Sequence, residues 1–248
     1  MLFVRSLFFA GLHIVSAIIF SLLAVIVWPL PFKWRYKLVS QWAISNLWLL
    51  KIICGIRYEV QGLDNISDEP CIILCKHQSS WETLALQAIF PPQVWVLKRE
   101  LLWIPFFGWG LASLNPIAID RGAGRKALNQ IIEQGQDRLS SGAWVVIFPE
   151  GTRIASGVMG KFGIGGARLA VETGFPVVPI AHDAGKAWPR HGFIKYPGVI
   201  KLVIGAKIAT EDKTASDLNQ QVFEWMESEM TVLEGKTPTL QSRLKGDD

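Results

Sequence analysis

The sequence predicts an α/β domain that follows an N-terminal helical membrane anchor, and three observations support this architecture. Residues 6–32 contain no Asp, Glu, Lys or Arg. Beyond residue 55, short runs rich in apolar and β-branched residues alternate with helix-like segments. Half of the 248 residues are hydrophobic and only 19% are charged, against roughly 25% charged residues in an average soluble domain.

The charge-free segment at residues 6–32 is long enough to cross a bilayer core, which requires ~20 apolar residues in a helix. A cleaved signal peptide has a shorter apolar core and a small-residue cleavage site. This run ends instead in Trp28–Pro31, so we expect a retained anchor. Basic residues follow at Lys33, Arg35 and Lys37, whereas only Arg5 precedes the segment. If the segment spans the membrane, that asymmetry places the next domain on the cytoplasmic side.

A second apolar helix is expected at residues 40–53, and two placements are open for it. Trp42, Leu47 and Ile53 suit a helix that lies on or dips into the bilayer surface. They equally suit an amphipathic helix that packs on the domain. The sequence alone does not separate these placements.

The α/β prediction for the following domain depends on the alternation of strand-like and helix-like segments. Several of the strand-like runs are continuously apolar, as expected for strands covered on both faces. Helical patterns lie between them, and this alternation is typical of an α/β domain. The expected strands are 56–60, 70–75, 93–97, 116–119, 143–148, 176–180 and 200–204, and the clearest expected helices are 124–139, 166–173 and 216–229.

Three regions are therefore predicted along the chain. Residues 1–55 form the membrane anchor with one or two helices, residues 56–232 form the catalytic domain, and residues 233–248 form a polar, mobile tail.

Composition and missing motifs exclude several classes of protein. The net charge of +4 suits an anionic membrane surface or a phosphate-bearing substrate better than nucleic acid, given the hydrophobicity of the chain. Three scattered cysteines (Cys54, Cys71 and Cys75) do not indicate a disulfide framework or a metal site, and we expect them to be small buried residues. The motifs of common hydrolases, P-loop nucleotidases and zinc proteases are missing.

His77 is the first candidate for a catalytic residue. It follows an expected strand and precedes an expected helix, which places it at the rim of the sheet. Glu82 could hold the imidazole in one tautomer if His77 lies in the turn before the helix, because residues five apart do not share a helix face. The alternative is a capping box in Ser79–Glu82, where Glu82 bonds only a backbone amide.

The second candidate cluster is Phe148–Arg153, which follows another buried strand. Gly151 would let the backbone approach a ligand closely, and Thr152 offers a hydroxyl. Arg153 carries a planar guanidinium that suits phosphate oxygens. The alternative is an ordinary turn with a surface salt bridge between Glu150 and Arg153.

Four sequence blocks occur in a fixed order. They are His77 with Glu82; Lys98-Arg99-Glu100-Leu101 with Pro105, Gly108, Asp120 and Arg121; Phe148–Arg153; and Phe175–Ile180. Together they resemble the glycerolipid acyltransferase family, specifically the 1-acylglycerol-3-phosphate acyltransferases, over about residues 56–210. Two positions depart from the family pattern. Glu82 stands where Asp is commoner, and Lys161 precedes the downstream aromatic residue Phe162 where members often carry a Lys after it.

The resemblance implies a mixed sheet flanked by helices, the glycerolipid acyltransferase fold. It also implies transfer of a fatty acyl group from acyl-CoA or acyl carrier protein to the free hydroxyl of lysophosphatidic acid, giving phosphatidic acid, with no cofactor and no metal. His77 would act as general base and Glu82 would orient it. Acceptor binding would involve Lys98, Arg121, Glu150, Gly151, Thr152 and Arg153. Residues 101–109 would line an acyl groove, touch the bilayer or pack in the core.

The implied partners are membrane lipids, a lysophospholipid acceptor and the acyl donor, and the implied location is the bacterial inner membrane with the catalytic domain on its cytoplasmic face. Two alternatives are kept. One is an acyltransferase for another acceptor, such as a lyso-aminolipid, and the other is a membrane-anchored binding protein with a decayed acyltransferase fold.

Overall fold

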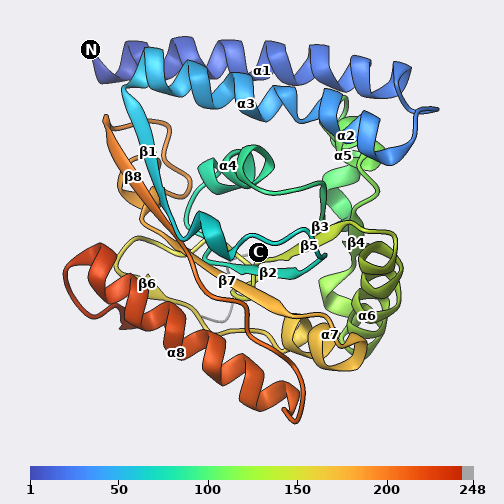
Figure 1. The fold of residues 1–248 in the computed structure, drawn as a ribbon. Coiled ribbons are helices and arrows are strands. Elements are labelled where there is room, and N and C mark those ends of the chain that lie inside the picture. Colours follow the sequence, from blue (N-terminus) through green and yellow to red (C-terminus); the bar gives the residue numbers. More distant parts are fainter. Residues whose placement is uncertain (242–248) are drawn as a thin grey trace.

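A computed structural model describes residues 1–241 of the chain, and it shows an α/β domain with two long N-terminal helical segments lying along one side (Figure 1). The central sheet has the strand order β1-β8-β7-β2-β5-β3-β4. Its strands are β1 (Ile56–Gln61), β2 (Ile72–Cys75), β3 (Gln93–Lys98), β4 (Ile117–Ile119), β5 (Trp144–Ile147), β7 (Val177–His182) and β8 (Gly198–Ile204). The pairs are parallel except for β7 with β8, which are antiparallel, so the predicted mixed sheet is confirmed.

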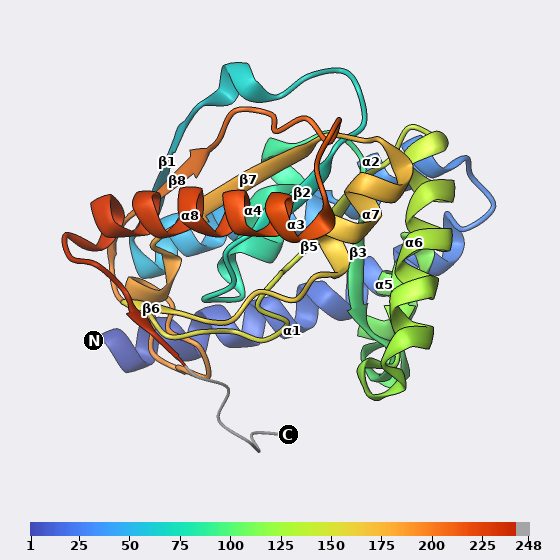
Figure 2. The same cartoon turned by 90° about the horizontal axis from the view of Figure 1, so that it is seen from below.

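Helices cover both faces of this sheet. On one face lie α3 (Gln41–Leu49) and α4 (Trp81–Ile89), and on the other lie α6 (Arg125–Ser140), α7 (Gly165–Thr173) and α8 (Ala215–Glu234) (Figures 1 and 2). Strand β2 shows why its sequence is continuously apolar. Ile73 and Cys75 belong to the core beneath α4, whereas Ile72 and Leu74 belong to the core beneath α7 and α8. Alternate side chains of one strand therefore fill two cores.

The expected anchor is the helix α1 (Leu2–Ile26), which is long and apolar enough to cross a membrane. Its most apolar 18-residue window has a mean hydropathy of 2.4, and only 17% of that window is buried. It packs beside α3 and α5 (Phe107–Ser113). A turn and the short helix α2 (Phe32–Val39) follow it, and α2 was not expected. Pro31 precedes its first residue, where a fixed φ angle favours the start of a helix.

A polar network joins α1 to α3. Nδ1 of His13 lies 2.7 Å from Oδ1 of Asn46, and the Asn46 amide donates to the Ser16 hydroxyl. The Trp42 indole also donates to Ser16, and its ring packs against His13. His13, unusual in so apolar a segment, therefore has a polar partner on the neighbouring helix. Helix α3 also contacts α4 and buries Ala43 and Leu47, so it packs on the domain.

The C-terminal end differs from the sequence expectation. A capping box between Thr214 and Asp217 starts α8 close to the expected residue, but the helix continues to Glu234 and ends at Gly235 in a left-handed conformation. Beyond it, β9 (Thr239–Leu240) pairs with β6 (Val158–Met159) in a small parallel sheet. The expected tail from residue 233 therefore begins with the last turn of α8 and contains the short strand β9, and residues 242–248 lie outside the described residues.

Candidate active site

The candidate residues meet at one edge of the sheet because of the strand order. Strands β2, β5, β3 and β4 are neighbours and run parallel, so their carboxyl ends lie along the same edge. His77 follows β2, residues 148–153 follow β5, Lys98 ends β3 and Arg121 follows β4. Residues as far apart in the sequence as His77 and Arg153 therefore lie along one edge of the sheet.

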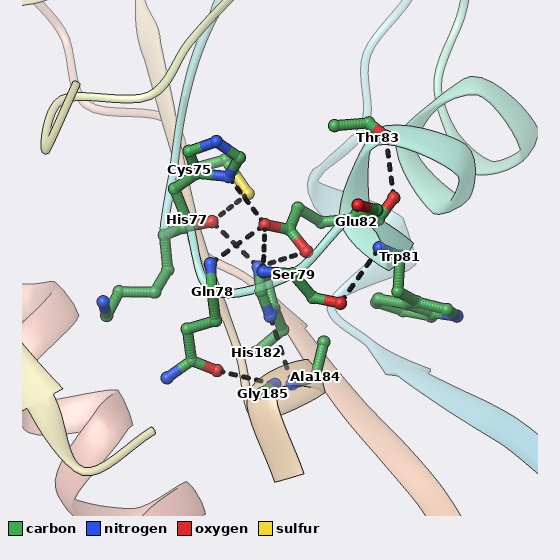
Figure 3. A network of polar contacts seen from close by, with 12 residues as sticks. Cys75, His77, Gln78, Ser79, Trp81, Glu82, Thr83, His182, Ala184 and Gly185 are labelled. Atoms are coloured by element: carbon green, nitrogen blue, oxygen red, sulfur yellow. Dashed lines mark hydrogen bonds and ion pairs between the residues drawn. The ribbon is translucent and has the colours of Figure 1, made fainter. Parts of the chain in front are cut away.

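His77 lies in the turn before α4, and Glu82 reaches back to it from the first turn of that helix (Figure 3). Nδ1 of His77 is 2.7 Å from Oε1 of Glu82. The same oxygen accepts the backbone N–H groups of Gln78 and Ser79, both at 2.9 Å. Glu82 therefore contacts the imidazole and also accepts hydrogen bonds from backbone amides. Orientation of His77 and bonding of backbone amides, the two alternatives considered for Glu82, thus occur together.

These contacts determine the His77 tautomer. An ionised carboxylate only accepts hydrogen bonds, so Nδ1 of His77 must carry the proton. Burial raises the pKa of Glu82, but the neighbouring rings of His182 and His77 and the Ser79 amide outweigh this and lower the pKa to about 2. Glu82 is consequently ionised at neutral pH. In the neutral ring, a proton on Nδ1 leaves the lone pair on Nε2, which is then able to accept a proton.

The His77 ring is also fixed by stacking. It lies parallel to Phe148, with 3.9 Å between ring centroids and 13° between planes. The His77 side chain is 14% exposed, so the ring is held on two sides and still reaches solvent.

Glu150 faces inward rather than toward solvent. Its carboxylate accepts two hydrogen bonds from the Lys76 ammonium, at 2.7 and 2.9 Å, and both side chains are 0% exposed. It also accepts the backbone N–H groups of His77 at 3.1 Å and Gly160 at 2.8 Å. The Glu150–Arg153 surface salt bridge considered from the sequence is not the arrangement found. Glu150 instead ties the start of its own loop to the backbone of His77.

Further backbone contacts join the two loops. The Ile154 amide donates to the His77 carbonyl at 2.7 Å. Arg121 donates to the Gly151 carbonyl, and Arg190 donates to the Arg153 carbonyl at 2.7 Å. Gly151 has a φ of 68°, a left-handed conformation that favours glycine at this turn. Two guanidinium groups therefore lie against the loop that carries Arg153.

His182 is the second imidazole near this site, at the end of β7. It is fully buried, and its Nε2 donates to the Lys76 carbonyl at 2.8 Å while its Nδ1 accepts the Ala184 amide at 3.3 Å (Figure 3). Burial lowers the pKa of His182, so it is neutral at pH 7. The 3.9 Å approach of Nε2 to Oε2 of Glu82 is accordingly not an ion pair.

Comparisons with known proteins identify the family of this chain. The Acyltransferase family model matches residues 57–183. The 1-acyl-sn-glycerol-3-phosphate acyltransferase of Pseudomonas aeruginosa is 50% identical over 93% of this chain and 91% of its own length. The chain belongs to the 1-acyl-sn-glycerol-3-phosphate acyltransferase family. It is therefore an O-acyltransferase of phospholipid synthesis.

More distant members of the family extend the comparison. The alpha form of 1-acyl-sn-glycerol-3-phosphate acyltransferase from Homo sapiens is 36% identical over 59% of this chain and 53% of its own length. The crystal structure of the 1-acyl-sn-glycerophosphate (LPA) acyltransferase PlsC from Thermotoga maritima aligns with a TM-score of 0.78 over 97% of both chains. At 22% identity this second match shows the fold, which is the expected acyltransferase fold.

The remaining site candidates of this acyltransferase lie at the surface. Lys98 at the end of β3 and Thr152 in the loop after β5 are both exposed, as is Lys161. In the run 101–109, five large apolar side chains are 36–67% exposed, so core packing is not their role. They are Leu101, Trp103, Ile104, Phe106 and Trp109.

Sequence reasoning missed several residues that support the site. Lys76 directly precedes His77, yet no pattern indicated that its side chain would be buried against Glu150. His182 has no motif partner in the sequence, and the structure buries it completely. Arg190 carried no motif. Lys76 follows β2 and Glu150 follows β5, so their pairing can be predicted only when these two strands are known to be neighbours.

Proposed function

We propose that the chain transfers a fatty acyl group from acyl-CoA or acyl carrier protein to the free hydroxyl of lysophosphatidic acid, giving phosphatidic acid. The observation that carries this proposal is the geometry of His77, whose Nδ1 bonds Glu82 at 2.7 Å and whose backbone carbonyl accepts the Ile154 amide next to Arg153. The family membership sets the class of reaction, and this geometry supports a general base next to cationic groups.

In the proposed reaction, Nε2 of His77 takes the proton from the acceptor hydroxyl. The hydroxyl oxygen then attacks the thioester carbonyl carbon and forms the new ester bond. The carbon–sulfur bond breaks, and the leaving thiolate takes the proton from the imidazolium. Nδ1 keeps its proton throughout, and Glu82 stabilises the transient charge on the ring. The donor and acceptor are substrates, and the proposal needs no resident cofactor or metal.

The acceptor phosphate is proposed to lie against Arg153, Arg121 and Lys98. A guanidinium offers paired donors that match phosphate oxygens, and Gly151 with Thr152 would add a backbone amide and a hydroxyl. Glu150 would contribute through its loop, because its carboxylate already accepts four hydrogen bonds from protein groups. A negative charge in that position would also repel phosphate if it faced the ligand.

Membrane lipids are the proposed surroundings of α1 and of the exposed apolar residues in 101–109. Lys33 and Lys37 lie exposed just after α1, in agreement with a catalytic domain on the cytoplasmic face of a bacterial inner membrane. Arg35 contributes differently, because its buried guanidinium donates to the carbonyls of Trp28 and Leu30. It therefore holds the turn that ends α1.

The test is thiol release by detergent-solubilised protein supplied with acyl-CoA or acyl carrier protein and one of two acceptors. We expect release with lysophosphatidate that depends on the acceptor, with product confirmed by mass spectrometry. Preference for a lyso-aminolipid would move the function to another acceptor. No release with either acceptor and either donor would favour the decayed binding protein and end the proposal.

A further inference from the structure

The C-terminal end of the chain reaches back to the active-site edge, although it lies beyond residues 57–183 that match the family model. After the last turn of α8 the chain turns back toward β6, as Figure 2 shows. Helix α8 ends at Glu234, and β9 follows at Thr239–Leu240. The two elements contact different parts of the loop that follows Arg153.

Glu234 is buried, with a side chain that is 5% exposed. Its Oε1 accepts the Ser156 hydroxyl at 2.7 Å and the Gln78 amide at 3.5 Å. Its Oε2 lies 3.5 Å from the Lys186 ammonium. Burial raises the pKa of Glu234, but the Ser156 hydroxyl and the Lys186 charge outweigh this and lower it. The group is therefore a charged acceptor at neutral pH.

Each partner of Glu234 belongs to a different segment of the site. Gln78 directly follows His77, and its side-chain oxygen accepts the Gly185 amide at 3.1 Å (Figure 3). Ser156 lies three residues after Arg153. Lys186 lies in the turn after β7 and also donates to the Leu233 carbonyl at 2.6 Å. The Glu234 carboxylate thus joins three segments: the one that follows His77, the loop that follows Arg153, and the turn after His182.

Backbone pairing holds the same loop further along. The Thr239 amide donates to the Gly157 carbonyl at 3.0 Å, and the Gln241 amide donates to the Met159 carbonyl at 2.8 Å. The start of the loop is held by two other hydrogen bonds, from the Ile154 amide to the His77 carbonyl and from the Arg190 guanidinium to the Arg153 carbonyl. The C-terminal segment therefore completes the support of residues 154–160.

Helix stability does not explain Glu234. A carboxylate at the last residue of a helix is repelled by the partial negative charge of the helix C-terminus. Burial adds a desolvation cost for its charge. A Glu at this position is unfavourable for α8 itself, and its compensating partners all belong to the loops at the active-site edge or to their immediate continuation.

We propose that Glu234 is a positioning residue for acceptor binding, which holds the loop after Arg153 in its binding geometry through Ser156. The proposal rests on the proposed acceptor site at Arg153. Glu234 touches neither substrate nor reacting atoms, so its loss acts through the placement of Arg153 and its neighbours. Donor binding does not depend on it.

The kinetic test compares Glu234→Ala, Glu234→Gln and Ser156→Ala with Glu224→Ala, a control on the exposed face of α8. For Glu234→Ala we expect the acceptor KM to rise about 10-fold, the loss of one charged hydrogen bond, with an unchanged donor KM. Glu234→Gln keeps an oxygen that accepts the Ser156 hydrogen bond, so it should raise the KM for the acceptor substrate only about 3-fold. Combining Ser156→Ala with Glu234→Ala should add little, because both remove the same bond. Glu224→Ala should match the parent chain.

Hydrogen exchange supplies a readout that needs no substrate. Amides of residues 154–160 should exchange faster in Glu234→Ala and Ser156→Ala, but not in Glu224→Ala. Equal loss of donor and acceptor efficiency together with a lower Tm would assign Glu234 to general stability and overturn the proposal. Unchanged acceptor KM or unchanged exchange would overturn it as well. If the parent chain does not acylate lysophosphatidate, the proposed function fails, whereas the exchange experiment still tests the loop support.

Discussion

Two carboxylates contact His77, Glu82 in α4 and Glu150 in the loop after β5, and both side chains are 0% exposed. Glu82 bonds the imidazole and the amides that follow it. Glu150 bonds the backbone amide of His77 and the ammonium of Lys76. One carboxylate therefore orients a ring, and the other fixes the path of the chain that carries the ring.

The two carboxylates also differ in how their charge is compensated. Glu150 faces the Lys76 ammonium, which donates two hydrogen bonds to it, and two backbone N–H groups complete this buried ion pair. Glu82 has no Lys or Arg partner among residues 1–241, and its contacts are two backbone amides and an imidazole N–H. Removing one partner of a buried pair leaves an uncompensated charge. We therefore expect stability to depend mainly on Glu150 and turnover mainly on Glu82.

His77→Ala removes the group that Glu82 orients and keeps the backbone that Glu150 holds. Turnover should fall about 1000-fold, because general-base catalysis contributes on that scale. Lost stacking on Phe148 should cost only roughly 1 kcal/mol of stability. Steady-state kinetics and urea unfolding measure the two effects. Retained turnover would remove His77 from the role of base.

Glu150→Gln tests the second carboxylate, which pairs with Lys76. The Lys76 ammonium would stay buried without its counter-charge, so we expect a loss of roughly 3–5 kcal/mol in the free energy of unfolding. Lys76→Met combined with Glu150→Gln should recover much of that loss, because no unpaired charge remains. Equal stability of the single and double variants in urea unfolding would show that the pair is not a unit.

Glu82→Gln should leave stability much closer to the parent than Glu150→Gln, yet lower turnover about 100-fold, because an amide can donate to Nδ1 and favour the wrong tautomer. Glu82→Asp keeps the charge and should lower turnover about 10-fold at most. The kcat values of the two variants show whether Glu82 orients His77. Comparable values would mean that Glu82 serves only the backbone amides of Gln78 and Ser79.

Arg153→Ala separates substrate binding from proton transfer within the Glu150 loop. Loss of one charged hydrogen-bonding partner should raise the acceptor KM about 10-fold and leave kcat nearly unchanged. Arg190, which donates to the carbonyl of Arg153, can keep that contact because the backbone is retained. Acceptor titrations at saturating donor measure the effect, and an unchanged acceptor KM would place the phosphate elsewhere.

Much of the fold was predictable because its strands are short, apolar and buried on both faces. The strand runs beginning at Ile56 and Gln93 were placed within a residue of their ends. Helix α2 was missed because its sequence, with Lys33, Arg35 and Lys37 in eight residues, reads as a flank of the anchor. Strand β9 was missed because two exposed residues carry no alternation that a pattern could detect.

The candidate site was predictable where one local segment makes the contact, and not where two distant segments meet. His77 and Glu82 are five residues apart, and the required turn before the helix follows from helix geometry. Glu150 and Lys76 are 74 residues apart, and Glu234 and Gln78 are 156 apart. Such pairs depend on which strands are neighbours and on where the C-terminal segment packs. A local sequence pattern contains neither piece of information.

His182 lies between the two carboxylate systems, and its titration offers the smallest but most specific test of them. Its ring donates to the Lys76 carbonyl on the Glu150 side and lies 3.9 Å from Oε2 of Glu82 on the other. Burial lowers the pKa of His182 below 6.5, and the charge of Lys76 acts in the same direction. The carboxylate of Glu82 and the Lys76 carbonyl oppose that shift without cancelling it.

Because the folded pKa of His182 is lowered, the unfolded chain binds a proton below pH 6.5 that the folded chain does not. Its contribution to stability is therefore complete above pH 6.5 and is lost as the pH falls toward the folded pKa, with a maximum slope of about 1.4 kcal/mol per pH unit. His182→Gln should remove this slope between pH 7 and 5, whereas the same change at the exposed His191 is the matched control. Urea unfolding at a series of pH values measures it. Parallel pH profiles for the parent and His182→Gln would mean that the ring titrates alike in both states, which would contradict the lowered pKa of His182 in the folded chain.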